Sequence, residues 1–120
     1  MTPQELRRER QRYAGDILAR YRQTPGTLGH VRPEDRRLAL WLWDRNVPLA
    51  MVEDAFILAV ARRTFRPPDA PPLDPIRSLH YFVPLMEELM QGRVQPSYLD
   101  RLRQKLLDRT ASLTTHPLER

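Results

Sequence analysis

Arginine is the residue type that gives this chain most of its binding chemistry, and three places in the sequence could carry binding. Lysine and arginine together number 20, and Lys105 is the only lysine. A guanidinium group forks onto phosphate oxygens and stacks on bases better than an ammonium group does. The three places are the run of Arg62, Arg63 and Arg66, the segment 77–82 with Arg77 and Tyr81, and the last predicted helix with Arg101, Arg103, Lys105 and Arg109. These residue types predict a nucleic-acid-binding surface.

Each basic cluster also has a purely structural explanation. Arg62 and Arg63 fall at the predicted end of a helix, where cations complement the negative end of the helix dipole. The basic face of the last helix is also typical of a solvated surface. The functional alternative is phosphate contact, the commonest use of clustered arginine in nucleic-acid complexes. In segment 77–82, a base could stack on Tyr81 while Arg77 holds a phosphate, with Phe82 in the core.

The residues that serve as metal ligands, nucleophiles or general bases are not arranged for those tasks. His30, His80 and His116 are scattered without metal-ligand spacing. Adjacent carboxylates at 53–54 and 87–88 point in different directions on a helix. The four glycines are isolated, and the chain has no cysteine. We therefore predict a protein with no catalytic residue, no metal, no cofactor and no small-molecule substrate.

Composition limits the class of protein further. A chain of 120 residues with 41% hydrophobic and 29% charged residues is predicted to be one globular domain. Charge interrupts every apolar stretch, so we expect no membrane span. The first residues lack the apolar core of a signal peptide. With no cysteine to form disulfides, a cytoplasmic location is expected.

The net charge of +5 is unevenly spread along the chain. Residues 1–24 carry six basic and three acidic groups, and residues 93–120 carry the same numbers. Residues 25–66 carry seven basic and five acidic groups, whereas residues 67–92 carry one and four. Basic ends on either side of an acidic segment suit an anion-binding surface, or docking on acidic regions of a partner.

Apolar spacing predicts five helices and no strand. The first covers 4–22, the second begins at Pro33, and Asn46 is a left-handed terminator before a third helix over 48–64. Pro67 to Pro72 form a stiff connector. The fourth helix is capped by Asp74 or Ser78, and Pro84 predicts either a kink or a short first turn. Ser97 and Asp100 predict a capping box for the fifth helix.

These elements predict an all-α fold, a compact bundle of about five helices with the proline-rich connector before the fourth. Residues 1–113 are expected to form the single domain and residues 114–120 a flexible tail. In the first helix, Leu6 is expected on the buried stripe. Trp41 and Trp43 cannot share a helix face, and Trp43 is expected to be the exposed one. The predicted core is Leu38, Leu42, Val52, Phe56, Leu79, Phe82, Val83, Met86, Leu102 and Leu106.

The middle of the chain has an order of helices and aromatic residues that resembles a known family. A helix ends with aromatic residues in 41–48, a second helix contains 52–55, and segment 78–85 places Tyr81 and Leu85 four residues apart. In this respect the run from about Arg32 to Met90 resembles the C-terminal domain of DnaD-like primosome and phage replication proteins. In that family, a loop leads to a helix that bears a Tyr-x-x-x-Ile/Leu motif.

The resemblance implies association with DNA and contacts with other replication proteins, with Tyr81 and nearby basic residues close to the contact surface. The chain departs from the family pattern at Pro84, inside the motif helix, and in the proline-rich connector at 67–72. These departures favour a helical module of a mobile element over a subunit of a host primosome.

Two functions therefore remain open from the sequence. In the first, a non-catalytic module holds DNA or RNA, with arginines on phosphates and Tyr81 stacked on a base. In the second, the protein is a protein–protein adaptor or a small helical subunit of a larger nucleoprotein complex. The expected partners are nucleic acid and other protein subunits, without a membrane.

Overall fold

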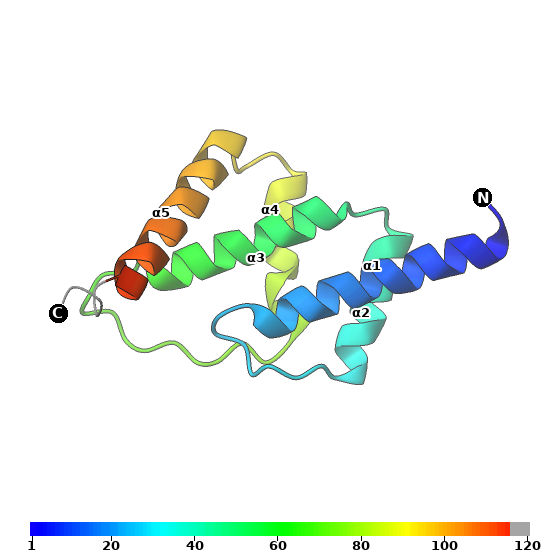
Figure 1. The fold of residues 1–120 in the computed structure, drawn as a ribbon, viewed down its shortest axis with the longest axis horizontal. Coiled ribbons are helices and arrows are strands. Elements are labelled where there is room, and N and C mark those ends of the chain that lie inside the picture. Colours follow the sequence, from blue (N-terminus) through cyan, green and yellow to red (C-terminus); the bar gives the residue numbers. More distant parts are fainter. Residues whose placement is uncertain (116–120) are drawn as a thin grey trace.

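Five α-helices and one short 3-10 helix form the structure, a computed structural model that describes residues 1–115, with side chains described through residue 111 (Figure 1). The elements are α1 (Pro3–Gln23), α2 (Pro33–Asp44), α3 (Leu49–Thr64), η1 (Leu79–Phe82), α4 (Val83–Met90) and α5 (Pro96–Thr115). The predicted all-α bundle is confirmed, and residues 1–115 contain no strand. Among the described helices, none combines the length and the apolar character that a membrane span needs.

α1 begins with a capped turn and extends beyond the rest of the bundle. The Thr2 hydroxyl accepts a hydrogen bond from the Glu5 amide at 3.1 Å. In Figure 1 the N-terminal turns of α1 project past the other helices, and Leu6 is exposed there. The prediction that Leu6 lies on the buried stripe was wrong, because no other helix covers α1 at that point. The stripe is buried from Tyr13 to Tyr21.

A short turn joins α2 to α3, and α1 packs against both helices. Asn46 has the expected left-handed conformation, with φ of 59°, and the Tyr13 hydroxyl donates a hydrogen bond to the Val47 carbonyl at 2.6 Å. Trp43 packs edge-on against Tyr13, with ring centroids 5.4 Å apart. Trp41 is instead 47% exposed. The prediction for the two tryptophans was therefore wrong, because α1 covers the side of α2 that carries Trp43.

The connector between α3 and η1 is pinned to the loop that follows α1. The Ile76 amide donates to the Gly26 carbonyl at 2.7 Å, and the Leu28 amide donates to the Ile76 carbonyl at 3.2 Å. Ser78, rather than Asp74, caps the following turn by accepting from the His80 amide. Of the two outcomes predicted for Pro84, the structure has the short first turn. Pro84 then lies in the first turn of α4, where its missing N–H costs no helical hydrogen bond.

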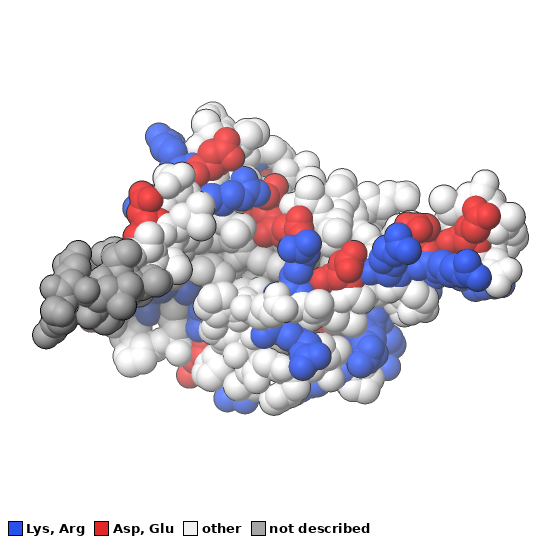
Figure 2. Space-filling model, viewed as in Figure 1, with Lys and Arg blue, Asp and Glu red and all other residues white. Residues whose placement is uncertain are grey.

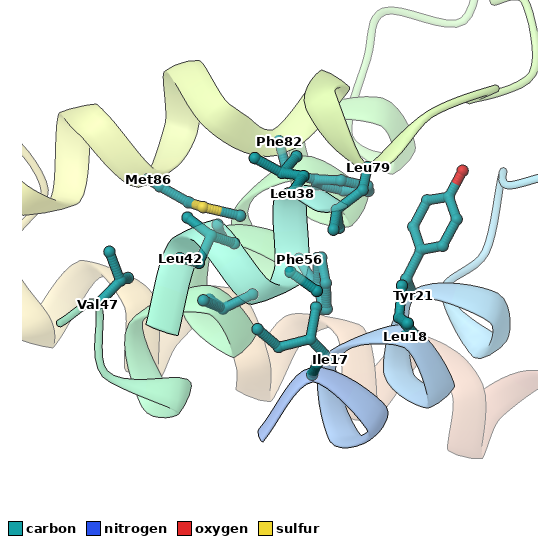
Figure 3. Packing of buried hydrophobic residues seen from close by; sticks show 14 of the residues in the cluster. Ile17, Leu18, Tyr21, Leu38, Leu42, Val47, Phe56, Leu79, Phe82 and Met86 are labelled. Atoms are coloured by element: carbon teal, nitrogen blue, oxygen red, sulfur yellow. The ribbon is translucent and has the colours of Figure 1, made fainter. Parts of the chain in front are cut away.

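The core lies where α1, α2, α3 and η1–α4 meet (Figure 3). The Phe82 ring packs edge-on against Phe56, at 4.7 Å between centroids, and against Tyr21 at 6.0 Å. A second, smaller cluster holds α5 against α3 and consists of Leu58, Ala61, Leu99 and Leu102. Of the predicted core residues, only Val83 and Leu106 are partly rather than fully buried.

One carboxylate, Asp35, is fully buried and ties α2 to η1. It accepts hydrogen bonds from the Arg32 amide and from the Leu79 amide, both at 2.9 Å. The Ser78 hydroxyl lies 3.4 Å from the same side chain. Because both oxygens are satisfied, the burial of this charge positions η1 instead of destabilising the fold.

α5 differs from the prediction at its start. The helix begins at Pro96, so Ser97 lies inside the first turn and is not its N-cap. Asp100 pairs with Arg103 at 3.2 Å. At the other end, α5 continues through Thr115. The rest of the predicted tail, together with His116, lies outside the described residues.

Candidate nucleic-acid interface

Seven of the eight predicted site residues lie at or just after the C-terminal end of α3, on η1 or on the first half of α5. We call this region the α3-end surface, defined by Arg62, Arg63, Phe65, Arg66, Tyr81, Tyr98, Arg101 and Lys105. The last turn of α3 contributes Arg62 and Arg63, and the residues just after the helix contribute Phe65 and Arg66. η1 contributes Tyr81, and the first half of α5 contributes the remaining three. Two hydrophobic contacts of α5 with α3, Leu99 and Leu102, place these α5 side chains beside the helix end.

Arg63 and Tyr81 form one pair on this surface. The Arg63 guanidinium lies 3.3 Å from the Tyr81 hydroxyl and 5.7 Å from the centre of its ring. The other nitrogen of the fork donates to the Asp74 carbonyl at 2.8 Å. Arg63 therefore joins the connector to the end of α3 and at the same time holds Tyr81, whose side chain is 42% exposed.

Arg62 is instead paired with a carboxylate. Its two terminal nitrogens donate to the two Glu88 oxygens, both at 2.9 Å. These hydrogen bonds, with the charge of Arg62, lower the pKa of Glu88. The hydrogen bonds that Arg62 donates to Glu88, together with the charge of that carboxylate, raise the pKa of Arg62. Arg62 is thus neutralised, and the predicted role for it as a free phosphate contact does not fit this geometry.

Two further exposed aromatic rings lie on the α3-end surface, each beside a cation. The Lys105 ammonium is 4.2 Å from the centre of the Phe65 ring, and the Arg101 guanidinium is 5.8 Å from the centre of the Tyr98 ring. Phe65 is 36% and Tyr98 40% exposed. Exposed cation–aromatic pairs of this kind contribute about 0.5–1 kcal/mol. They leave both the ring and the charge accessible to a ligand.

Two predicted site residues, Arg103 and Arg77, have other surroundings. Arg103 points away from this surface and pairs with Asp54 and Asp100, so it is neutralised like Arg62. Arg77 is exposed between two pinned residues of the connector, and no contact among the described residues joins it to the α3-end surface. Arg66 is half-buried beside Phe65 and forms no ion pair with a described residue.

Phe65 and Tyr98 are members of this surface that the sequence analysis did not single out. The signal for both is in the sequence, because Phe65 lies between Arg63 and Arg66, and Tyr98 precedes Arg101 by one helical turn. The interleaving of aromatic and basic residues that predicts a site in segment 77–82 therefore also applies to Phe65 and Tyr98. Arg7 and Arg8 lie away from the α3-end surface, on the projecting part of α1. They form no ion pair with a described residue.

The middle of the molecule has a different electrostatic character. Figure 2 shows blue and red side chains next to one another across this face. The ion pairs there include Arg10 with Asp44 at 2.8 Å and Arg20 with Glu53 at 2.5 Å. Among the described residues, no group of three histidines or carboxylates could hold a metal ion.

Comparison with known proteins found no match to this chain. No protein-family model matches the chain, and neither a curated protein nor a solved structure matches it. The resemblance to the C-terminal domain of DnaD-like proteins therefore stays a prediction.

Proposed function

We propose that this protein is a small non-catalytic nucleic-acid-binding module that holds a single strand on the α3-end surface. One observation carries the proposal. Phe65, Tyr81 and Tyr98 are exposed around one helix end, and each ring lies beside a cation that has no carboxylate partner among the described residues. Rings next to free cations are the arrangement that binds single strands without strong sequence preference.

The two kinds of side chain have separate tasks in this proposal. An exposed ring offers a stacking face to an unpaired base, and such stacking contributes about 1–3 kcal/mol per base. Arg66, Arg101 and Lys105 supply charge to the phosphates between stacked bases. A duplex hides its base faces, so it would use only the phosphate contacts, and we expect it to bind more weakly.

A place in DNA replication or in a mobile element is also part of the proposal, and it rests on the resemblance of residues 32–90. The family's contact surface is expected near Tyr81, which is a member of the α3-end surface here. A cytoplasmic location is expected for the same module, as is an association with other protein subunits.

Binding of labelled single-stranded and duplex oligonucleotides, measured by fluorescence anisotropy over a range of salt concentrations, tests this function. The variant Arg66→Ala/Lys105→Ala removes two cations from the α3-end surface. If both contact phosphates, the salt dependence for single strands should fall by about 1.4 in slope, since each contact contributes about 0.7. The matched control is Arg7→Ala/Arg8→Ala, which removes the same charge from the projecting end of α1.

The control variant should bind single strands nearly as well as the original protein. Tyr81→Ala should weaken binding about tenfold, whereas Tyr81→Phe, which keeps the ring, should weaken it less. Equal losses of affinity in the two double variants, Arg66→Ala/Lys105→Ala and Arg7→Ala/Arg8→Ala, would show that binding depends on diffuse charge and would overturn the assignment of the site. Absence of binding at low salt would overturn the function itself.

A further inference from the structure

A second surface, on the other side of η1, has the features of a protein-docking groove. It lies between α2 and the η1–α4 segment, has a volume of about 520 Å³, and is lined by Glu34, Arg37, Leu38, Trp41, His80 and Val83. Trp41 is 47% exposed, the largest aromatic side chain at the described surface. Its neighbours in the groove, Leu38 and Val83, extend the apolar floor to the core.

Cations stand on both sides of this tryptophan along α2. Arg37, Trp41 and Arg45 are spaced four residues apart, so they share one side of the helix and its C-terminal extension. The Arg45 guanidinium lies 5.1 Å from the centre of the Trp41 ring. Arg37 approaches Glu34 only to 3.7 Å, with both side chains more than half exposed. Such an exposed ion pair contributes little to stability. The guanidinium groups of Arg37 and Arg45 are therefore both available to a partner.

We propose that this groove docks an acidic segment of a partner protein, with an apolar side chain of that segment seated on Trp41. The occupant follows from charge and spacing. At 1.5 Å rise per residue, positions 37 and 45 are about 12 Å apart along the helix. An extended chain covers that distance in about four residues at roughly 3.3 Å each. The matching segment has carboxylates on either side of one central aromatic or branched aliphatic residue.

The lining of the groove favours a peptide over a nucleic-acid base. Leu38 and Val83 offer no hydrogen-bond partner to the polar edge of a base, and an unpaired polar edge is costly to bury. A leucine or phenylalanine side chain has no such polar edge. The groove therefore serves a different ligand from the α3-end surface.

This inference does not rest on nucleic-acid binding, since the groove is separate from the α3-end surface and would act without it. η1 separates the two, because His80 lines the groove and the next residue, Tyr81, contacts Arg63. A chain with both sites would connect a single strand of nucleic acid to an acidic segment of a protein subunit. That arrangement is the adaptor function in physical terms.

The test uses the full chain without nucleic acid and a labelled pentapeptide that has glutamate at each end and leucine at the centre. Related peptides carry tryptophan or glycine at the centre, or lysine at both ends. Binding is followed by anisotropy and, up to millimolar peptide, by amide chemical shifts of isotope-labelled protein. Trp41→Ala should weaken binding of the leucine peptide about tenfold, as expected for a central aromatic anchor. Glycine at the centre of the peptide should have a similar effect.

Charge reversal makes the test specific. Arg37→Glu/Arg45→Glu should abolish binding of the glutamate peptide and create binding of the lysine peptide. The control Arg101→Glu/Lys105→Glu makes the same change of charge on the α3-end surface and should leave peptide binding unchanged. Equal losses in both double variants would overturn the proposal, as would the absence of groove shifts with any glutamate peptide. Loss of oligonucleotide binding in Trp41→Ala, with no peptide binding, would assign the groove to nucleic acid instead.

Discussion

The two halves of α3 use arginine in opposite ways. In the first half, Glu53 and Asp54 each meet an arginine from another helix, Arg20 of α1 and Arg103 of α5. In the second half the charges are reversed, because α3 itself contributes Arg62 and Arg63. There Glu88 pairs with Arg62, and Arg63 has no carboxylate partner among the described residues.

The difference shows that the supply of carboxylates decides what an arginine does. Where an acidic partner is present, the guanidinium holds two helices together and has little charge left for a ligand. Where it is absent, the cation rests on an aromatic ring or a carbonyl oxygen and stays available. Arginine is therefore structural beside Glu53 and Asp54 and also at Arg62, whereas Arg63 has no carboxylate partner among the described residues and is assigned to the binding surface in the proposed function.

The largest expected effects distinguish the two hydrophobic clusters that α3 contacts. Phe56→Ala removes a ring from the main core, where Phe82 packs against it, and should lower the free energy of unfolding by about 3–5 kcal/mol. Leu102→Ala, in the small cluster under α5, should cost about 2–3 kcal/mol, since the site lies at the edge of the bundle and can relax. Urea unfolding measures both. A larger loss of stability in Leu102→Ala would show that the small cluster under α5 contributes more to stability than the main core, which would contradict this prediction.

The next largest effect concerns the carboxylate that positions η1 and hence Tyr81. Asp35→Ala leaves the buried Leu79 amide and the part-buried Arg32 amide without their acceptor, and an unsatisfied buried group costs about 1–3 kcal/mol. We expect a loss of stability in that range, and weaker oligonucleotide binding because Tyr81 is no longer held in place. Glu34→Ala, one residue earlier but exposed, is the matched control for thermal unfolding. Similar melting temperatures in the two variants would contradict the role given to Asp35.

A smaller effect tests the comparison between the two halves of α3 directly. Glu88→Gln frees Arg62 at the α3-end surface, so single-strand binding should strengthen several-fold and its salt dependence should rise by about 0.7 in slope. Glu53→Gln frees Arg20 in the first half with the same change of net charge. It should leave the affinity nearly unchanged in the same anisotropy measurement. An equal gain in both variants would show that net charge, and not position, controls binding.

The smallest effect is a dependence of stability on pH from the same pair. Arg62 lowers the pKa of Glu88 below its ordinary value of 4.5. The pair therefore contributes to stability above that pH, and the contribution is lost as the pH falls through the lowered pKa. For a partly exposed pair we expect at most about 1 kcal/mol. Urea unfolding at a series of acidic pH values should show a shallower decline in Glu88→Gln than in the original protein, and identical declines would contradict the assignment.

The helices were predictable because their signals are local. Pro33, Asn46 and Pro84 mark helix ends through their own backbone preferences, and the structure confirms each. The apolar spacing likewise identified most of the core. Failures came where a contact between distant segments decides the outcome. Trp43 is covered because α1 crosses α2, and Leu6 is exposed because nothing crosses α1 at that position.

The candidate site was predictable only in part for the same reason. The sequence shows where arginines cluster, but it does not show that Glu88 and Asp54 neutralise Arg62 and Arg103 from 26 and 49 residues away. Lys105 and Phe65 are also far apart in the sequence, which does not show that their side chains meet. Pairing between elements sets which charges remain free, and that information lies in the tertiary structure.

The most direct measurement is the mapping of amide chemical shifts as a short oligothymidylate is titrated into isotope-labelled protein at low salt. A single-strand site on the α3-end surface predicts the largest changes at residues 62–66, at Tyr81 and at residues 98–105, with little change at residues 3–12. Saturable binding whose shifts concentrate on the projecting turns of α1, or a spectrum that does not change at all, would contradict a single-strand site at the end of α3.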